Sequence, residues 1–387
     1  QSQKEVNYLV KEFECRKSAS AYARAITSRT GVLDTTKLHT YRYNEDLFRK
    51  ITVLPDGKNH GLVFVLDWSG SMAHVLQDTL KQLYNLLWFC KKVNIPFEVY
   101  AFTNNYPLQS YLSDGEPTSV RMPCYEKTEG VAHIDDHFSM MNILTSRVRG
   151  KVLEEQMVNI FRIGLAFSRI RDVQRYGIPI GLELSGTPLN ESLIALHQIL
   201  PKFKRDNKLE KVQCVILTDG QGSPLRFHKN FHRSWEDSPF LGTCNINENC
   251  FLRDRKLGTT YSMQGGWWSQ TDHFLRNLRD KFSDINFIGI RILAPRDGGE
   301  FIRKYTSSYS EESEKLVKSW RKDKAVSIKN SGYHTYFGLS AAALANEDGF
   351  DVGEDATKAQ IRSAFKKSLN GKKMNKKILG EFIKLVA

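Results

Sequence analysis

The sequence predicts an α/β protein built on a doubly wound, mostly parallel β-sheet flanked by helices. Apolar runs at residues 62–66, 212–218 and 286–293 are short, rich in β-branched residues and bounded by turn residues, as strands buried on both faces are. Helical patterns separate these runs, and alternation of strand and helix is typical of such sheets. With 387 residues, 41% of them hydrophobic, the chain is long enough for a large domain with insertions.

The first part of the chain leads into this sheet. Residues 1–60 predict a helical approach segment, with a helix from Tyr8 to Ser28. After the first buried strand, leucines at helical spacing predict an amphipathic helix over 74–92. The partly alternating pattern of residues 97–102 predicts a strand nearer an edge of the sheet.

The main domain is expected to span residues 61–350 and to carry two insertions. Residues 103–180 predict an insertion with helical pieces, mainly around 158–171, and residues 222–270 form the least regular region. Pro188 opens a leucine-periodic helix, since proline suits the first turn of a helix. The last predicted helix and strand of the sheet cover residues 271–280 and 286–293.

The segment after the first strand carries the most informative side chains of the chain. Asp67, Ser69 and Ser71 occupy alternate positions there, and Gly70 allows the backbone to turn tightly. Ligands of open α/β sheets bind at the carboxyl ends of the strands. Carboxylate and hydroxyl oxygens without histidine or cysteine suit a hard divalent cation, so this segment predicts a Mg²⁺ site.

Two further segments supply ligands of the same kind. Thr187 lies directly before the helix that Pro188 opens, and Asp219 follows the buried strand at residues 212–218. Together the three segments predict a metal site made by Asp67, Ser69, Ser71, Thr187 and Asp219. Trp68 is expected either exposed beside the metal or packed against the sheet.

The D-x-S-x-S pattern, followed by Thr187 and Asp219, resembles the metal-ion-dependent adhesion site of von Willebrand factor A domains. The resemblance implies that Ser69 and Ser71 bind the ion directly and that Thr187 binds it directly or through water. It implies that Asp67 and Asp219 act through water. It also implies an open coordination position that receives a carboxylate from a partner protein.

A closer resemblance covers roughly residues 10–300. L-D-x-x-K-L at 33–38, D-x-S-G-S-M at 67–72 and G-T-P-L at 186–189 are similar to the metal-site subunit of aerobic cobaltochelatase and to its tailed-bacteriophage relatives. The resemblance implies a cytoplasmic, non-catalytic subunit, in the host cytoplasm if phage-encoded. Such a subunit has no nucleotide site and is the partner of a hexameric AAA+ ATPase and of a substrate-bearing component.

Two other functions stay open at this point. The chain could be a genuine cobaltochelatase subunit of cobalamin synthesis, or a metal-dependent peptidase or other hydrolase whose catalytic residues do not match a known pattern. The sequence contains no G-x-x-x-x-G-K-[ST] loop, no H-E-x-x-H and no G-x-S-x-G. We therefore expect no catalytic activity from the chain alone. Asp135, Asp136 and His137 are expected in a solvated loop.

The net charge of +13 is concentrated near the end of the chain. Lysines and apolar residues at roughly helical spacing predict two basic amphipathic helices over residues 351–387. Lysines within 358–384 could contact nucleic acid, but the sequence favours lysines that are merely solvated, because no nucleic-acid motif accompanies them. No apolar run is long enough to span a membrane.

The 6 cysteines are scattered, which is typical of a reduced, intracellular protein. Cys90 and Cys214 lie in apolar stretches and are expected to be buried. His228, His232, Cys244 and Cys250 could hold zinc, but their spacing favours an ordinary loop with free thiols.

Overall fold

The structure is a computed structural model of the 387-residue chain. It describes the main body of the protein. The described residues are 7, 10, 26–33, 48–53, 60–105, 109–111, 117–120, 125–168, 178–179, 181–218, 222–232, 235, 238–294, 296–306, 310–329 and 331–340.

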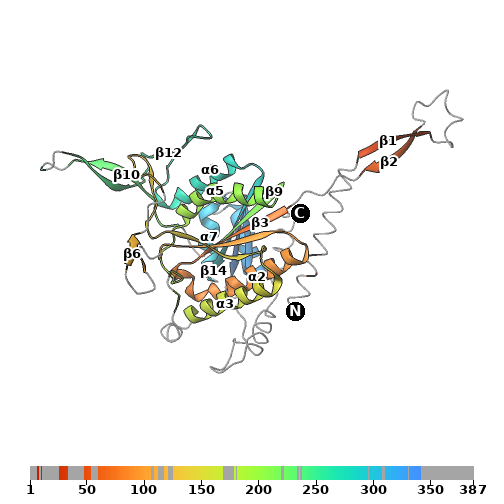
Figure 1. Ribbon diagram of the computed structural model, residues 1–387, viewed down its shortest axis with the longest axis horizontal. Helices are drawn as coiled ribbons and strands as arrows, with labels where there is room; N and C mark the ends of the chain where they lie inside the picture. The colour runs from red at the N-terminus through yellow and green to blue at the C-terminus, as the bar shows by residue number, and fades with distance from the viewer. Residues whose placement is uncertain are drawn as a thin grey trace, which may run out of the picture.

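A seven-stranded sheet forms the centre of the molecule, with the order β15-β16-β14-β9-β3-β4-β8 (Figure 1). Neighbouring strands pair in parallel from β16 to β4, whereas β15 and β8 pair antiparallel at the two edges. The predicted mostly parallel α/β sheet is therefore confirmed. The strands are β3 (His60–Asp67), β4 (Phe97–Thr103), β8 (Ser139–Thr145), β9 (Lys211–Thr218), β14 (Ile285–Leu293), β15 (Ala325–Ile328) and β16 (Thr335–Ser340).

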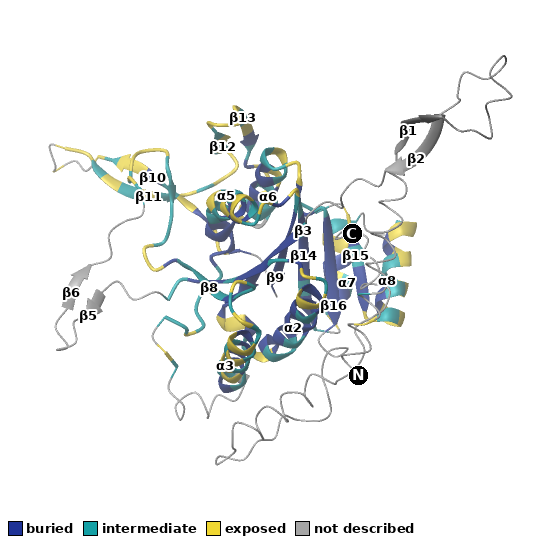
Figure 2. Cartoon of the chain, turned by 45° about the vertical axis from the view of Figure 1, so that its right-hand side comes forward, coloured by how far each residue is buried: buried dark blue, intermediate teal, exposed yellow. Residues whose placement is uncertain are grey.

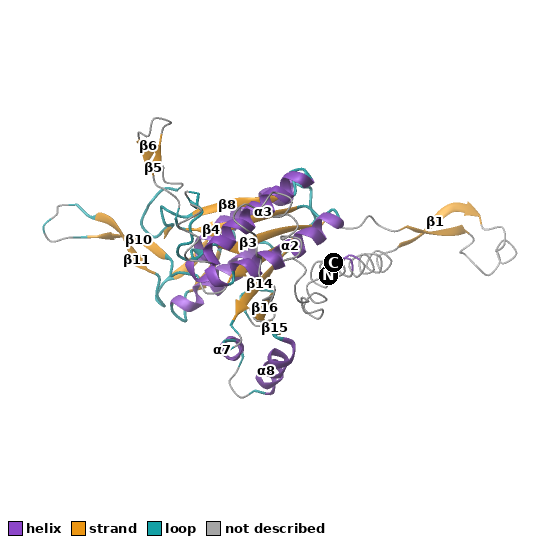
Figure 3. Ribbon diagram, turned by 90° about the horizontal axis from the view of Figure 1, so that it is seen from below, coloured by secondary structure: helices purple, strands orange, loops and turns teal. Residues whose placement is uncertain are grey.

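Helices cover both faces of this sheet. On one face lie α2 (Leu76–Lys92) and α3 (Gly150–Ser168) (Figures 1 and 3). On the other lie α5 (Leu189–Asp206) and α6 (Gln270–Lys281) (Figure 1). The side chains of β3 alternate between the two cores: Leu62 and Phe64 pack on the α2 side, and Val63 and Val65 on the α5 side. Both sets are fully buried, which explains the uninterrupted apolar run of this strand (Figure 2).

The chain reverses its direction of travel through the sheet between β3 and β9. From β3 it continues to β4 on one side, whereas from β9 it continues through α6 to β14 on the other side. The point between β3 and β9 is therefore the switch point of the sheet. In open α/β sheets this switch point is where ligands bind.

The first predicted insertion contributes to the sheet itself, contrary to expectation. After β4 the chain forms the small hairpin of β5 (Gln109–Tyr111) and β6 (Pro117–Val120), then β7 (Ala132–His133), the edge strand β8 and α3. The helix α3 begins at Gly150 rather than near Val158, and residues 169–171 lie outside the described residues. Its side chains Leu153, Met157 and Phe161 complete the core under α2.

The region predicted to be the least regular contains two antiparallel hairpins. The first pairs β10 (Arg226–Phe231) with β11 (Phe240–Asn245), and β10 also pairs with β7. The second pairs β12 (Phe251–Asp254) with β13 (Thr259–Ser262), before the short helix η3 (Trp267–Ser269). Their strands face solvent on one side, so they carry no long apolar run that would reveal them in sequence.

Segments near the two ends also differ from expectation. Strands β15 and β16 extend the sheet, and helices α7 (Gly298–Tyr305) and α8 (Glu311–Asp323) precede them in the chain. No element was predicted from the sequence in this part of the chain. Strands β1 (Ile26–Leu33) and β2 (Phe48–Val53) form an antiparallel ribbon that stands apart from the central sheet in Figure 1. Residues 26–28, the end of the helix predicted over Tyr8–Ser28, lie in β1 instead, and residues 11–25 lie outside the described residues. The predicted basic helices of residues 351–387 lie outside the described residues.

Within the described part of the chain, no helix combines the length and the apolar character needed to cross a lipid bilayer.

Candidate metal-binding loops

Asp67 ends β3 at the switch point and is fully buried. The parallel register pairs Leu66 with Leu217, so Asp67 and Thr218 end adjacent strands side by side. The hydroxyl of Thr218 donates a 2.7 Å hydrogen bond to Oδ2 of Asp67. This bond fixes the direction in which the carboxylate points.

Ser69 and Ser71 lie in the loop and first turn that follow, where the short helix η2 (Gly70–His74) begins. Their hydroxyl oxygens are 3.1 Å apart. Ser69 is buried at 1% exposure, whereas Ser71 is exposed. The backbone N–H of Met72 donates to the carbonyl of Ser69 and closes the turn at 3.1 Å. The alternate positions predicted from sequence thus bring two hydroxyls together at the sheet edge.

The segment that contains Thr187 lies directly beside this loop. Ser185 forms an isolated parallel β-bridge with Ser69, and the N–H of Gly70 donates a 2.7 Å bond to the carbonyl of Ser185. Two residues later, Thr187 is half-buried, and its carbonyl accepts a 2.8 Å bond from the N–H of Ser223, beyond β9. Three chain segments therefore meet here: the loop of Ser69, the segment of Ser185 and Thr187, and the residues at Ser223 beyond β9.

Two asparagines after β4 hold the same segment in place, and sequence reasoning did not identify them. Asn104 Oδ1 accepts a 2.7 Å bond from the N–H of Gly186, and Asn105 Nδ2 donates a 3.0 Å bond to Glu183. Both follow a parallel strand of the sheet at its carboxyl end. This position in the sequence could have identified them, because the carboxyl ends of parallel strands all lie at the same edge of the sheet.

Trp68 packs inside the protein, which decides between the two placements left open by the sequence. Its side chain is fully buried, and its Nε1–H donates a 2.7 Å bond to the carbonyl of Leu182. Its ring meets Phe167 edge-on, with 6.2 Å between the ring centroids. Trp68 is thus a support beneath the loops rather than part of their exposed face.

Asp219 lies outside the described residues, as do Gly220 and Gln221. The structure describes four of the five predicted ligand residues: Asp67, Ser69 and Ser71 on one loop, and Thr187 on the segment bonded to it. Thr218 is the last described residue of β9.

The donor set of the described residues fits a hard cation. Octahedral Mg²⁺ holds oxygens at about 2.1 Å, so two adjacent ligands lie about 3 Å apart. The 3.1 Å between the Ser69 and Ser71 hydroxyls matches that spacing. Histidine and cysteine do not take part, and the described residues contain no group of three or more His, Cys, Asp or Glu side chains that could hold a metal. The residues His228, His232, Cys244 and Cys250 therefore form no such group.

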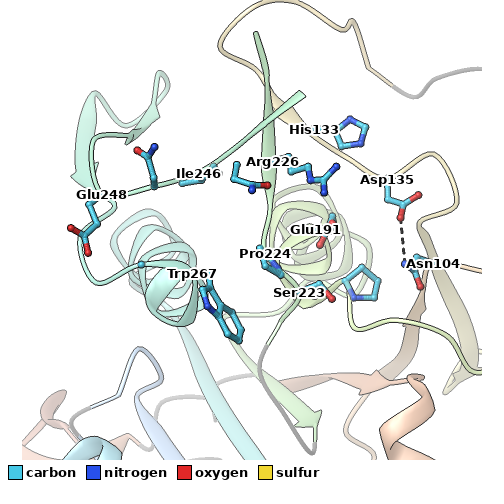
Figure 4. Close-up of a pocket in the computed structure, with 14 residues that line it drawn as sticks. Asn104, His133, Asp135, Glu191, Ser223, Pro224, Arg226, Ile246, Glu248 and Trp267 are labelled. Atoms are coloured by element: carbon cyan, nitrogen blue, oxygen red, sulfur yellow. Dashed lines mark hydrogen bonds between the residues drawn. The ribbon is translucent and has the colours of Figure 1, made fainter. Parts of the chain in front are cut away.

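A hollow of about 730 Å³ opens next to these loops, bounded by the start of α5, by β7 and β10, and by the segments 245–248 and 266–267 (Figure 4). Asp135 lines it, half-buried, and its Oδ2 accepts a 3.3 Å bond from Asn104. Asp135 thus lies in a loop, as expected, but is half-buried, whereas Asp136 and His137 are exposed. Asp136 pairs with Lys127 at 2.9 Å, and this contact lowers the pKa of its carboxyl.

Glu191 lies in the first turn of α5 and forms part of the same hollow. Its side chain is buried, with 7% exposed, and burial raises the pKa of its carboxyl to about 7. A hydrogen bond from its own backbone N–H acts in the opposite direction, and the nearby charge of Asp135 raises the pKa further. Sequence reasoning missed Glu191, because an acidic residue in a first helical turn is ordinary and its burial has no sequence signal.

His133 lines the hollow and belongs to an aromatic cluster with His228 and Tyr125. His228 is buried and its Nε2 lies 3.0 Å from the hydroxyl of Tyr125. The ring of His133 meets that of His228 edge-on at 5.0 Å. Burial lowers the pKa of His133, and the neighbouring His228 lowers it further, so His133 is neutral at pH 7.

The described cysteines are Cys90, Cys214, Cys244 and Cys250, and all four are free thiols. Cys90 and Cys214 are fully buried, as predicted, and burial raises the pKa of both thiols far above the usual range.

Comparison with known proteins gives no family for this chain. No family model and no curated protein matches it. Among solved structures, it is similar to the open conformation of the pilus adhesin SpaC from Lactobacillus rhamnosus GG, at 15% sequence identity and a TM-score of 0.32. That match covers 81% of this chain and 30% of the adhesin chain. A similarity this distant carries no functional argument.

Proposed function

We propose that this protein is a Mg²⁺-dependent protein-binding module of the von Willebrand factor A type, acting as an adaptor for an AAA+ ATPase. The observation that carries the proposal is the pair of hydroxyls of Ser69 and Ser71, 3.1 Å apart beside the buried carboxylate of Asp67. In this proposal Thr187 and Asp219 complete the ligand set. The location at the switch point of the sheet supports it.

The chemistry of this ligand set favours binding over catalysis. Neutral hydroxyls leave most of the charge of the cation uncompensated, so the ion attracts a carboxylate from a partner into its remaining position. The partner therefore presents an Asp or Glu at its contact surface. The ion would be bound by Ser69 and Ser71 directly and by Asp67 through water.

The ATPase partner rests on the resemblance to chelatase metal-site subunits and on the lack of a phosphate-binding loop in the sequence. The same resemblance suggests a cytoplasmic protein of phage type. Among the described residues that line the hollow, no hydrogen bond joins a hydroxyl or thiol to a histidine or carboxylate, so a hydrolase is not the function proposed.

The decisive experiment measures ion binding and partner binding with the same variants. Purified chain is titrated with Mn²⁺, as a spectroscopic substitute for Mg²⁺, and is then used to capture partners from native lysate with Mg²⁺ or with EDTA. Ser71→Ala should abolish both, because one hydroxyl ligand is lost. Ser238→Ala is the matched control, since Ser238 is also exposed but lies in the β10–β11 hairpin connection.

An AAA+ ATPase should be among the captured proteins, and its ATP hydrolysis should change when chain and Mg²⁺ are added together. Ion binding that survives Ser71→Ala would refute the metal site. ATP hydrolysis or proteolysis by the chain alone, lost in Ser71→Ala, would replace the adaptor with an enzyme.

A further inference from the structure

The hollow next to the proposed metal site has an excess of negative charge. Its lining contains three acidic side chains, Asp135, Glu191 and Glu248, and one basic side chain, Arg226. Figure 4 shows Asp135 and Glu191 on one side and Glu248 on the other, with Trp267 at the lower edge. A ligand of this hollow should therefore carry positive charge.

Glu191 is the strongest indication that a ligand belongs here. It is more than nine-tenths buried, and within the described residues no hydrogen bond reaches its Oε2. The start of α5 offsets part of the cost of this buried carboxylate, since a helix N-terminus favours negative charge. A buried acceptor without a hydrogen bond still destabilises the structure, and a donor on a ligand would remove that cost.

His133 adds a second acceptor to the same wall. The pKa of its ring is lowered, so it stays neutral, and within the described residues no hydrogen bond reaches its Nδ1. Cross-strand pairing with Arg226 places His133 at the edge of the hollow. A neutral imidazole nitrogen and a carboxylate oxygen can both accept from one –NH₃⁺ group, which has three donors.

Trp267 provides an aromatic surface at the lower edge of the same hollow (Figure 4). It lines the hollow and is 44% exposed, which is unusual for so large an apolar side chain. The face of an indole attracts an ammonium or guanidinium group within about 6 Å of the ring centre.

We infer that this hollow binds an organic cation through a primary ammonium group, held by Glu191, Asp135 and His133 and flanked by Trp267. A bare metal ion fits less well: the described acidic and histidine side chains form no group that could hold one. The hollow of about 730 Å³ also has room for an alkyl chain. The ammonium could come from a lysine side chain of a partner protein or from a free diamine.

Arg226 opposes the cation from the rim of the hollow. It is exposed, and its cross-strand position next to His133 brings its positive charge close to the proposed ammonium. Its removal should therefore strengthen binding. An anionic ligand would show the opposite response.

The test measures binding by calorimetry and by Trp fluorescence, using Nα-acetyl-lysine methylamide, its norleucine analogue and 1,4-diaminobutane. All titrations contain EDTA, so that the result is independent of the proposed metal site. We expect the lysine derivative to bind and the norleucine analogue, which lacks only the ammonium, not to bind. Tighter binding of the diamine than of the lysine derivative would identify a free diamine as the ligand, and the reverse would identify a lysine side chain.

The variants decide which residues hold the ammonium. Glu191→Gln should weaken binding by about tenfold or more, as expected for a hydrogen bond to a charged group. Glu311→Gln is the matched control, because the Glu311 side chain is 91% exposed on α8 and should leave binding unchanged. Arg226→Gln should strengthen binding several-fold.

Three results would overturn the inference. In the first, the unmodified chain binds neither amine. In the second, the norleucine analogue binds as tightly as the lysine derivative. In the third, a folded Glu191→Gln variant binds the amines as tightly as the unmodified chain does. Because glutamine has the shape of glutamate without its charge, this variant should fold, and circular dichroism verifies that it does. Weaker amine binding in Arg226→Gln would also overturn the inference, because removing a nearby positive charge should not weaken the binding of a cation.

Discussion

The hydroxyl of Thr218 donates a 2.7 Å hydrogen bond to the carboxylate of Asp67, joining the ends of two adjacent parallel strands. Both side chains are buried, so this bond cannot be replaced by bulk water. It links the first and third of the segments proposed to hold the cation. Thr218 is therefore a positioning residue of the proposed site.

The first prediction concerns this bond. Thr218→Val keeps the shape of the side chain but removes the hydroxyl donor. The buried Oδ2 of Asp67 then loses this hydrogen bond. We expect a loss of about 1–3 kcal/mol in the free energy of unfolding of the metal-free chain. Urea denaturation monitored by circular dichroism measures this loss.

Thr103→Val is the matched control for that experiment. Thr103 is also fully buried at the carboxyl end of a neighbouring strand, but its hydroxyl has no hydrogen bond within the described residues. The valine should therefore be neutral or stabilising there. Equal losses for the two variants would show that the bond to Asp67 does not matter.

The second prediction concerns Glu191 and pH. The pKa of its carboxyl is about 7 in the folded chain, above the ordinary 4.5 expected after unfolding. Between these values the unfolded chain binds fewer protons than the folded one, so stability falls as pH rises from about 4.5 to about 7. Above pH 7 the full cost is present, about 3 kcal/mol for a shift of this size.

Glu191→Gln should remove that cost. The variant should be more stable than the unmodified chain at pH 8 and equal to it at pH 4.5, as judged by urea denaturation at both pH values. A constant difference across this range would show that burial does not perturb the carboxyl of Glu191.

The third prediction concerns His197 on α5. Burial lowers the pKa of its ring to about 4, and the charge of Lys281 lowers it further. The unfolded chain therefore takes up a proton near pH 6.5, before the folded chain does. The stability due to the neutral ring is present above pH 6.5 and is lost as pH falls toward 4.

His197→Gln should flatten the acid side of the stability profile by about 2 kcal/mol, because glutamine cannot take up a proton. Thermal unfolding at pH 7 and pH 4.5 gives the measurement. If the variant loses as much stability as the unmodified chain on acidification, another group is responsible.

The fourth prediction concerns the close approach of α7 and α8. A Cβ atom on Gly298 would lie 2.0 Å from the ring of Trp320, which is buried in the core. Gly298→Ala should therefore destabilise the chain by about 1–3 kcal/mol, the usual range for overpacking. Gly299→Ala is the control, since its nearest neighbour would be the end of Arg303 at 3.9 Å.

The parallel core of the fold was predictable because its strands are buried on both faces. β3, β9 and β14 read as continuous apolar runs, and the leucines of α2 and α5 recur at helical spacing. The hairpins β10–β11 and β12–β13 were missed, since their exposed side chains interrupt any such run. β8 was missed because its side chains are mostly only half-buried at the edge of the sheet.

The sequence predicted those residues of the candidate site that come directly after a recognisable strand. Asp67, Ser69 and Ser71 could be found in this way, but the contacts of Asn104 and Trp68 could not. Both depend on the path of residues 182–186, which comes from tertiary packing rather than from local pattern. The hollow around Glu191 is formed by segments that are more than 100 residues apart in the chain, so no sequence spacing reveals it.

The segment from Leu182 to Gly186 is tied to the ends of β3 and β4 at four of its residues. Its bonding partners are Trp68, Asn105, Gly70 and Asn104, in the order of the segment. These bonds also fix the position of Thr187, the next residue, before any ion is bound. Thr187 should therefore lose little conformational entropy on ion binding. Ion uptake should then be limited by the shedding of water from Mg²⁺ rather than by rearrangement of the chain.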